Sequence, residues 1–124
     1  MTDLFSLKDK SVVITGGFGI LGQEFVSCML SSGARVAILD YNIKPAKIAD
    51  DLRKALELGT HLKAFQVNIT KRAELEKALA DVKAVWGTPW GLVNNAALDS
   101  PPDAPHSENG PFETYPEESL RKII

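Results

Sequence analysis

Residues 11–22 of the chain read SVVITGGFGILG, an apolar run that leads directly into a glycine-rich segment. Val12, Val13 and Ile14 are continuous rather than alternating with polar residues, which is typical of a strand buried on both faces of a parallel sheet. An apolar pattern of helical period follows the glycines. The segment therefore predicts a strand, a tight turn and a helix in direct succession.

The glycines of this segment have the spacing Gly-x-x-Gly-x-x-Gly at Gly16, Gly19 and Gly22. A glycine turn that runs into a helix N-terminus suits an anion, because the first helical N–H groups are unpaired and the helix dipole is positive there. We expect Gly16 to form the turn, Gly19 to let a pyrophosphate approach the backbone, and Gly22 to let the helix pack closely. No lysine follows Gly22, so this is not the phosphate loop that binds nucleoside triphosphates.

The order of strand and helix repeats along the chain. Strands are expected at residues 11–15, 35–40, 62–67 and 90–95, with amphipathic helices between them. This alternation predicts an α/β fold: a Rossmann-like doubly wound parallel sheet in three layers, with strand order 3-2-1-4. The expected core-facing stripes of the three helices are Leu21, Phe25, Cys28 and Met29; Ile48, Leu52, Ala55 and Leu56; and Leu75, Leu79, Val82 and Trp86.

The last quarter of the chain has a different character. Residues 98–115 are expected to form a surface loop, because residues 98–111 hold four of the seven prolines and show no periodicity. Residues 116–124 resemble the start of a helix that is cut before it ends. We therefore expect residues 1–124 to be the N-terminal part of one Rossmann domain, truncated before the remaining strands.

An acid at the end of the second expected strand indicates which ligand the glycine turn binds. Asp40 lies 24 residues after Gly16, where a carboxylate accepts hydrogen bonds from both hydroxyls of an adenosine ribose. The same charge repels a 2′-phosphate, so NAD(H) is predicted over NADP(H). A methyltransferase that uses S-adenosylmethionine has a similar glycine turn and acid, and these two features alone leave that alternative open.

Composition and charge exclude several other classes. A net charge of −2 gives no reason to expect nucleic acid or a membrane as partner, and no run is long and apolar enough to span a bilayer. Cys28 is the only cysteine and is expected in the core, and His61 and His106 have no neighbours at metal-ligand spacing, so no metal site is predicted. The N-terminus has no secretory pattern, and a cytoplasmic protein is expected.

Four motifs together resemble the N-terminal half of the short-chain dehydrogenase/reductase family. They are TGGFGILG at 15–22, LD at 39–40, VNIT at 67–70 and NNAA at 94–97. The resemblance implies an oxidoreductase that moves hydride between NAD(H) and a carbonyl or secondary alcohol of a small, sugar-like substrate, and a homo-oligomer at full length. It implies that Gly16, Phe18, Gly19, Ile20, Leu21 and Gly22 hold the pyrophosphate, Asp40 and Tyr41 the adenosine ribose, Asn68 and Ile69 the adenine edge, and Asn95, Ala96 and Ala97 the nicotinamide-side ribose.

Two details of the resemblance bear on these roles. Asn94 matches the residue that ties the central strands together, and Asn68 stands where the family usually has aspartate. An asparagine keeps a carbonyl oxygen, which is expected to accept a hydrogen bond from the exocyclic amine of adenine.

The chain departs from the family pattern at the glycine turn. Ile20 stands where the single-domain branch has glycine, and the observed spacing is more like the extended branch that modifies nucleotide sugars. NNAA and the segment at 112–124 resemble the single-domain branch, which we favour. A nucleotide-sugar epimerase or dehydratase, and a non-catalytic dinucleotide-binding module, remain alternatives.

The family's catalytic groups are a serine and a Tyr-x-x-x-Lys motif, in which lysine lowers the pKa of the tyrosine that acts as acid or base. Neither tyrosine fits, because Pro45 stands four residues after Tyr41 and Ser119 four residues after Tyr115. No catalytic residue is therefore predicted within the 124 residues. We expect these groups to lie beyond Ile124, and the 124-residue chain alone to bind cofactor without turnover.

Overall fold

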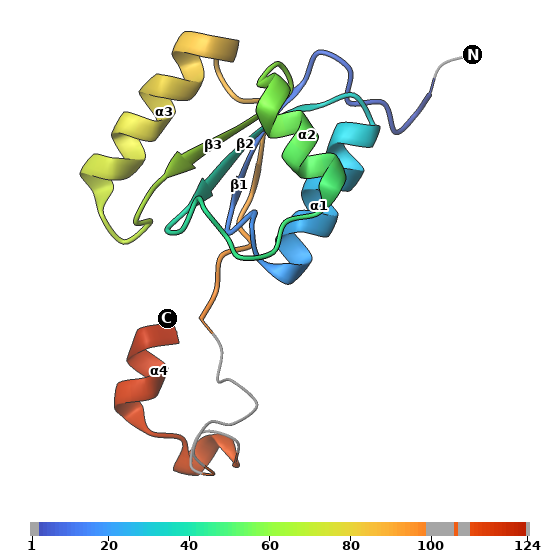
Figure 1. Ribbon diagram of the computed structural model, residues 1–124. Coiled ribbons are helices and arrows are strands. Elements are labelled where there is room, and N and C mark those ends of the chain that lie inside the picture. The colour runs from blue at the N-terminus through green and yellow to red at the C-terminus, as the bar shows by residue number, and fades with distance from the viewer. Residues whose placement is uncertain (1–2, 99–105, 107–109, 124) are drawn as a thin grey trace.

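The computed structural model describes residues 3–98, 106 and 110–123. Within them, four parallel strands form one sheet in the order β3-β2-β1-β4 (Figure 1). This order confirms the predicted Rossmann-like α/β fold. The strands are β1 (Ser11–Thr15), β2 (Arg35–Asp40), β3 (Leu62–Gln66) and β4 (Gly91–Val93); the helices are α1 (Ile20–Ser31), α2 (Asp50–Leu58), α3 (Arg72–Trp86) and α4 (Glu117–Ile123), with a short 3-10 helix, η2 (Phe112–Thr114).

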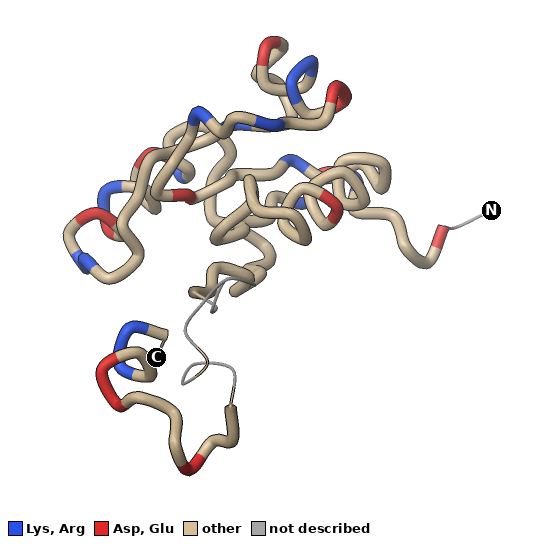
Figure 2. The backbone as a smooth tube through the Cα atoms, turned by 60° about the horizontal axis from the view of Figure 1, so that its bottom comes forward, with Lys and Arg blue, Asp and Glu red and all other residues tan. Residues whose placement is uncertain are grey.

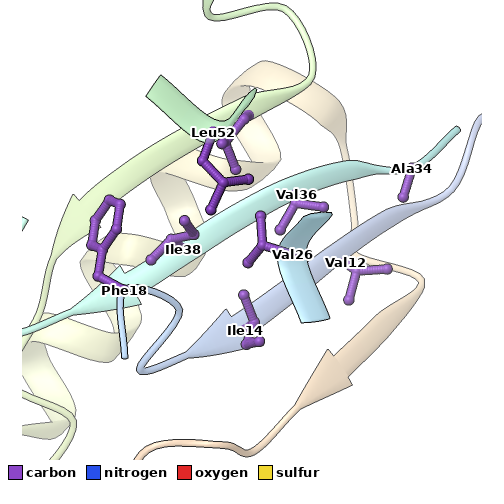
Figure 3. Packing of buried hydrophobic residues seen from close by; sticks show 9 residues of the cluster. Val12, Ile14, Phe18, Val26, Ala34, Val36, Ile38 and Leu52 are labelled. Carbon is purple, nitrogen blue, oxygen red and sulfur yellow. The ribbon is translucent and has the colours of Figure 1, made fainter. Parts of the chain in front are cut away.

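Helices cover both faces of the sheet, as Figure 1 shows, with α1 and α2 on one side and α3 on the other. Each face has its own apolar core, because parallel strands bury side chains in both directions. Figure 3 shows the first core, in which side chains from β1, β2, α1, α2 and the glycine turn converge. Its buried members are Val12, Ile14, Phe18, Val26, Ala34, Val36, Ile38, Leu52 and Leu62, and those of the second core are Val13, Ala37, Leu39, Val67, Ala78 and Val82.

β1 is the central element, and all five of its residues are buried. It pairs with β2 on one side, where Val13 is opposite Ala37, and with β4 on the other, where Val13 is opposite Leu92. The loops that follow β1, β2, β3 and β4 meet at the carboxyl edge of the sheet, because parallel strands all end on the same side. We call the ends of these four strands and the loops after them the carboxyl edge.

Three of the four residues of the predicted core stripe of α1 are exposed, and only Met29 packs against the first core. Gly22 and Val26 are the buried residues of this helix, while Leu21 and Phe25 are exposed. Cys28, expected in the core, is exposed as well. The reason is the rotation of α1 about its axis, which is set by the close contact of Gly22 with the glycine turn rather than by the largest apolar side chains.

The stripes of the other two helices are closer to expectation. In α2, Leu52 is buried and the other three predicted residues pack against the same core. In α3, Val82 is buried but Leu79 is 45% exposed, and the smaller Ala78 faces the sheet instead.

Of the expected surface loop at 98–115, residues 99–105 and 107–109 lie outside the described residues, and η2 occupies part of the remainder. The expected cut helix corresponds to α4, and Ile124 is also outside the description.

Charged residues of both signs are distributed along the chain, as Figure 2 shows. Within the described ranges, no helix has the length and apolar character needed to cross a bilayer.

Candidate functional site

The glycine turn connects β1 to α1 at the carboxyl edge. Gly16 has φ +65°, a conformation that side chains with a Cβ rarely adopt. Its N–H donates to Leu39 O at 2.8 Å, and its own carbonyl accepts from Gly19 N at 3.1 Å. A Cβ at Gly16 would lie 2.9 Å from Ala96 Cα, in the loop after β4. The backbone of residue 16 is therefore enclosed by protein on several sides, and only glycine fits.

The fold also requires glycine at position 22, but it does not require glycine at position 19. A Cβ at Gly22 would overlap the carbonyl oxygen of Gly16 and lie 2.9 Å from Gly17 Cα. Gly19 has an ordinary φ of −70°, and a Cβ there would meet only Gly16 O, at 3.4 Å. No internal contact in the described chain explains a glycine at 19, so the bare backbone there leaves space on the outer side of the turn.

The N-terminus of α1 opens onto this space. Gly19 is its N-cap, no side chain caps the helix, and its first turn has no acidic residue. The first N–H groups of a helix lack intrahelical acceptors, so they are available to an anion. Ile20 and Leu21 stand beside them with 92% and 65% of their surface exposed. Among the residues that the structure describes, these two exposed apolar side chains have no packing role.

Asp40, the last residue of β2, bonds to the glycine turn directly. Its Oδ2 accepts from Phe18 N at 3.1 Å, and its Oδ1 accepts from Asn42 N at 3.2 Å. Each carboxylate oxygen accepts more than one hydrogen bond, so both keep capacity for a ligand. The carboxylate is thereby held beside the turn, with Tyr41 next to it and 72% exposed.

The loop after β4 is tied to the glycine turn through Thr15, a role that no sequence motif indicates. The buried Thr15 hydroxyl accepts from Asn95 N at 3.1 Å and from Ala96 N at 3.0 Å. The Asn95 side chain donates from Nδ2 to Gly16 O at 3.0 Å. Asn95, rather than the expected Asn94, joins the two strand ends, and Asn94 is exposed. Ala97 follows, also exposed.

Asn68 begins the loop after β3 and forms a tight turn. Its Oδ1 accepts from Thr70 N at 3.0 Å and from Thr70 Oγ1 at 2.6 Å, and its N–H donates to Glu74 Oε1 at 3.2 Å. An amide oxygen has two lone pairs, and Thr70 uses both. Both bonds hold the amide oxygen within the chain, and its contact with adenine stays a prediction. Ile69, beside it, is partly exposed.

Gln23 is a second residue that the sequence did not reveal. From the first turn of α1, its Nε2 donates to Phe18 O at 2.9 Å and to Lys47 O at 3.0 Å, while its Oε1 accepts from Ala49 N at 2.9 Å. It thus connects the glycine turn to the loop between β2 and α2. A glutamine after a glycine turn has no sequence signature for such a role.

The carboxyl edge therefore brings together all the predicted binding positions. The turn holds Gly16, Phe18 and Gly19, and the first turn of α1 holds Ile20, Leu21 and Gly22; the end of β2 holds Asp40 and Tyr41; and the loops after β3 and β4 hold Asn68, Ile69, Asn95, Ala96 and Ala97. Phe18 differs from the others in that its side chain is buried in the first core, so only its backbone faces the edge. Among the described residues, no three His, Cys, Asp or Glu side chains cluster as metal ligands do.

Known proteins that resemble the chain include a reductase and a dehydrogenase. It is 28% identical over all 124 residues to the 5-keto-D-gluconate 5-reductase of Escherichia coli, covering 45% of that protein. It is 35% identical over 92 residues to the sorbitol dehydrogenase of Cereibacter sphaeroides, covering 74% of this chain and 34% of that one. The chain thus spans less than half the length of these relatives.

Solved structures share the fold. A short chain dehydrogenase from Leptospira borgpetersenii with bound NAD+ superposes with a TM-score of 0.70 at 25% identity, over 100% of this chain and 42% of that one. A 3-ketoacyl-(acyl-carrier-protein) reductase from Brucella melitensis complexed with NADH superposes with a TM-score of 0.74 at 27% identity, over 96% and 44%. The family model for short chain dehydrogenases matches residues 10–124. The chain therefore belongs to the short chain dehydrogenase family.

Proposed function

We propose that the carboxyl edge binds NAD(H), with the pyrophosphate against the glycine turn. The observation that carries this proposal is the open backbone at Gly19. Gly16 and Gly22 have steric reasons within the fold, whereas a Cβ at Gly19 would meet only one atom, at 3.4 Å. The uncapped N-terminus of α1 supplies N–H donors and a positive dipole at the same place. Ile20 and Leu21 would then lie along the ligand, which accounts for their exposure.

The adenosine half of the cofactor would extend toward β2 and β3. Asp40 is held beside the turn by Phe18 N, and its oxygens keep lone pairs for the two ribose hydroxyls. A 2′-phosphate would bring a second negative charge against this carboxylate, so NAD(H) is favoured over NADP(H). The base, bonded to the ribose, would reach Asn68 and Ile69 at the end of β3, the strand beside β2.

The nicotinamide half would extend the other way, toward β4. Asn95, Ala96 and Ala97 follow β4, which pairs with β1 on the side opposite β2. The two amide bonds to Thr15 fix this loop against the glycine turn. The cofactor would thus lie across the whole edge, in the order of the strands.

The reaction that we propose is hydride transfer between NAD(H) and a carbonyl or secondary alcohol on a sugar-like substrate. The cofactor supplies or accepts the hydride, and the residues of this chain bind and orient it. Two relatives are named for polyol and keto-sugar chemistry, a sorbitol dehydrogenase and a 5-keto-D-gluconate 5-reductase, which supports a polar substrate. The spacing of Gly16, Gly19 and Gly22 favours a nucleotide-sugar epimerase or dehydratase as a second candidate. Membership of the dehydrogenase family sets the methyltransferase alternative aside.

The groups that move the proton are proposed to lie outside these 124 residues, because neither Tyr41 nor Tyr115 is followed by lysine at the fourth position. The chain alone would then bind cofactor without turnover. Assembly into a homo-oligomer is part of the same proposal and follows from the family resemblance. A cytoplasmic location is proposed from the N-terminal sequence, which has no secretory pattern.

Titration of the chain with NADH, NADPH and S-adenosylmethionine distinguishes the candidate ligands. The fluorescence of NADH should rise on binding with a Kd at least tenfold below that of NADPH, and S-adenosylmethionine at the same concentration should not displace it. Failure of NADH to bind would refute the cofactor proposal. For the reaction, the protein made at the length its gene encodes should oxidise NADH with a keto-sugar in a panel of ketones, and the isolated 124-residue chain should not. Turnover by the isolated chain would contradict the placement of the catalytic groups.

A further inference from the structure

The glycine turn consists almost entirely of glycine. Between Thr15 and Ile20 the chain reads Gly-Gly-Phe-Gly, so Phe18 is the single residue there with a side chain. Glycine loses more backbone freedom on ordering than any other residue, so hydrogen bonds and packing must hold such a turn in one conformation. A site that is ordered before its ligand arrives binds more tightly, because binding does not have to order it. The groups that hold Phe18 therefore bear on the affinity of the turn for an anion.

Phe18 is held at three points. Its ring lies in the first core and is 6% exposed (Figure 3). Its N–H donates to Asp40 Oδ2 at 3.1 Å, and its carbonyl oxygen accepts from Gln23 Nε2 at 2.9 Å. The carbonyl shares a planar peptide group with the N–H of Gly19, which donates to Gly16 O at 3.1 Å. Rotation of this peptide would break both bonds, so Gln23 fixes its orientation from one side and Gly16 from the other.

The orientation of this peptide matters for a ligand because α1 begins directly after it. Gly19 is the N-cap of α1, and the helix starts at Ile20. The first N–H groups of the helix are the donors proposed for the pyrophosphate, and the direction of the chain at the N-cap sets where they point. Gln23, in the first turn of the same helix, thereby holds the peptide that precedes these donors.

The amide of Gln23 is itself fixed by the loop between β2 and α2. A backbone N–H can only donate, so the branch of the amide that lies 2.9 Å from Ala49 N is the oxygen, Oε1. The other branch, Nε2, has two hydrogens, and it donates one to Phe18 O and one to Lys47 O at 3.0 Å. These bonds give the side chain one orientation, in which one of its two donors is directed at the glycine turn.

We propose that Gln23 is a positioning residue for the cofactor, which raises affinity by holding the Phe18–Gly19 peptide in the conformation that receives the pyrophosphate. It acts through the turn rather than on the ligand. The inference rests on the proposed function, because it needs the cofactor at the glycine turn. It goes beyond that function in assigning part of the affinity to a side chain for which the sequence predicts no role.

Three variants of the protein, made at the length its gene encodes, separate this role from a purely structural one. Gln23→Met keeps the length and helix propensity of the side chain and removes its three hydrogen bonds. Gln23→Ala leaves room for water at Lys47 O and Ala49 N, and so provides a second folded protein without the bond to the turn. Ser27→Ala is the matched control, because Ser27 Oγ donates to Asp51 Oδ2 at 2.5 Å and joins α1 to α2 without involving the turn.

Isothermal titration calorimetry with NADH gives the Kd and the number of binding sites per chain. Both Gln23 variants are expected to keep the wild-type number of sites and to raise the Kd at least about threefold, the effect of losing one neutral hydrogen bond. Ser27→Ala is expected to change the Kd by less than about threefold. A purely structural role would lower the number of binding sites and leave their Kd unchanged, because the chains that stay folded would bind normally.

Two kinds of failure are distinguishable. A Kd raised less than about threefold in either Gln23 variant, or raised equally in Ser27→Ala, overturns the inference while binding of NADH by the wild type leaves the proposed function standing. A loss of binding sites at unchanged Kd also overturns it. A wild type that does not bind NADH overturns the proposed function and this inference with it.

Discussion

Substitution of single glycines in the turn separates the needs of the fold from those of the ligand. Gly19→Ala adds a methyl group whose nearest protein atom is Gly16 O at 3.4 Å, an ordinary contact, on a backbone with φ −70°. Alanine at a compatible conformation stabilises by about 0.4–1 kcal/mol through the unfolded chain, and alanine is a poorer N-cap than glycine by a similar amount. The free energy of unfolding is therefore expected to change by less than about 1 kcal/mol.

The effect of Gly19→Ala on cofactor binding is expected to be large. A phosphate oxygen that bonds to a backbone N–H lies about 2.9 Å from the nitrogen, whereas carbon atoms need about 3.5–4 Å from their neighbours. A methyl group on the outer side of the turn therefore displaces the pyrophosphate from the N–H groups of α1. Loss of one such charge-assisted bond is about 1.5–3 kcal/mol, which raises the Kd for NADH at least tenfold.

Gly22→Ala, in contrast, should lower the free energy of unfolding strongly. Its methyl group would overlap Gly16 O and lie 2.9 Å from Gly17 Cα, both of them backbone atoms that cannot rotate away. Overpacking of this kind costs about 3 kcal/mol, and more where backbone must move. Urea denaturation of the two variants measures the change in the free energy of unfolding, and fluorescence titration measures the change in the Kd for NADH. Wild-type cofactor affinity in Gly19→Ala, with unchanged stability, would show that no ligand approaches the turn there and would refute the reasoning.

Three further changes test other parts of the carboxyl edge. Asp40→Ala removes the proposed ribose ligand and should raise the Kd for NADH at least tenfold and narrow the preference over NADPH, both measured by titration; an unchanged preference would argue against the role of the carboxylate. Thr15→Val keeps the shape but leaves the two N–H groups of the β4 loop without their acceptor, which should lower the free energy of unfolding by about 2–4 kcal/mol in urea, while Thr15→Ser should restore most of it. Gln23→Leu removes one hydrogen bond to Phe18 O in the glycine turn and two to the loop before α2, and should cost about 1–3 kcal/mol. The control Ser27→Ala, which breaks one exposed bond to Asp51, should cost less than about 1 kcal/mol, and equal losses would deny Gln23 a special role.

Much of the fold was determined by the sequence alone. The run of apolar residues in β1, the glycines after it and the alternation with amphipathic helices predicted the parallel sheet and its order, because strand and helix periods are local properties of the chain. The positive φ of Gly16 and the acid at the end of β2 could likewise be anticipated, since both depend on spacing along the chain.

Tertiary structure decided what local patterns cannot encode. The rotation of α1, which leaves Leu21, Phe25 and Cys28 exposed, follows from the contact of Gly22 with the turn. The links made by Thr15 and Gln23 join segments distant in sequence, so no period or motif reveals them.

Asn68 is the clearest case of this division. The sequence placed an amide at the end of β3, and a free amide offers both a donor and an acceptor. Only the folded turn shows that Thr70 N and Thr70 Oγ1 both donate to Oδ1, so that this oxygen is bound within the chain. Residue identity thus sets which hydrogen bonds are available, and the geometry of the surrounding backbone sets which of them are left for a ligand.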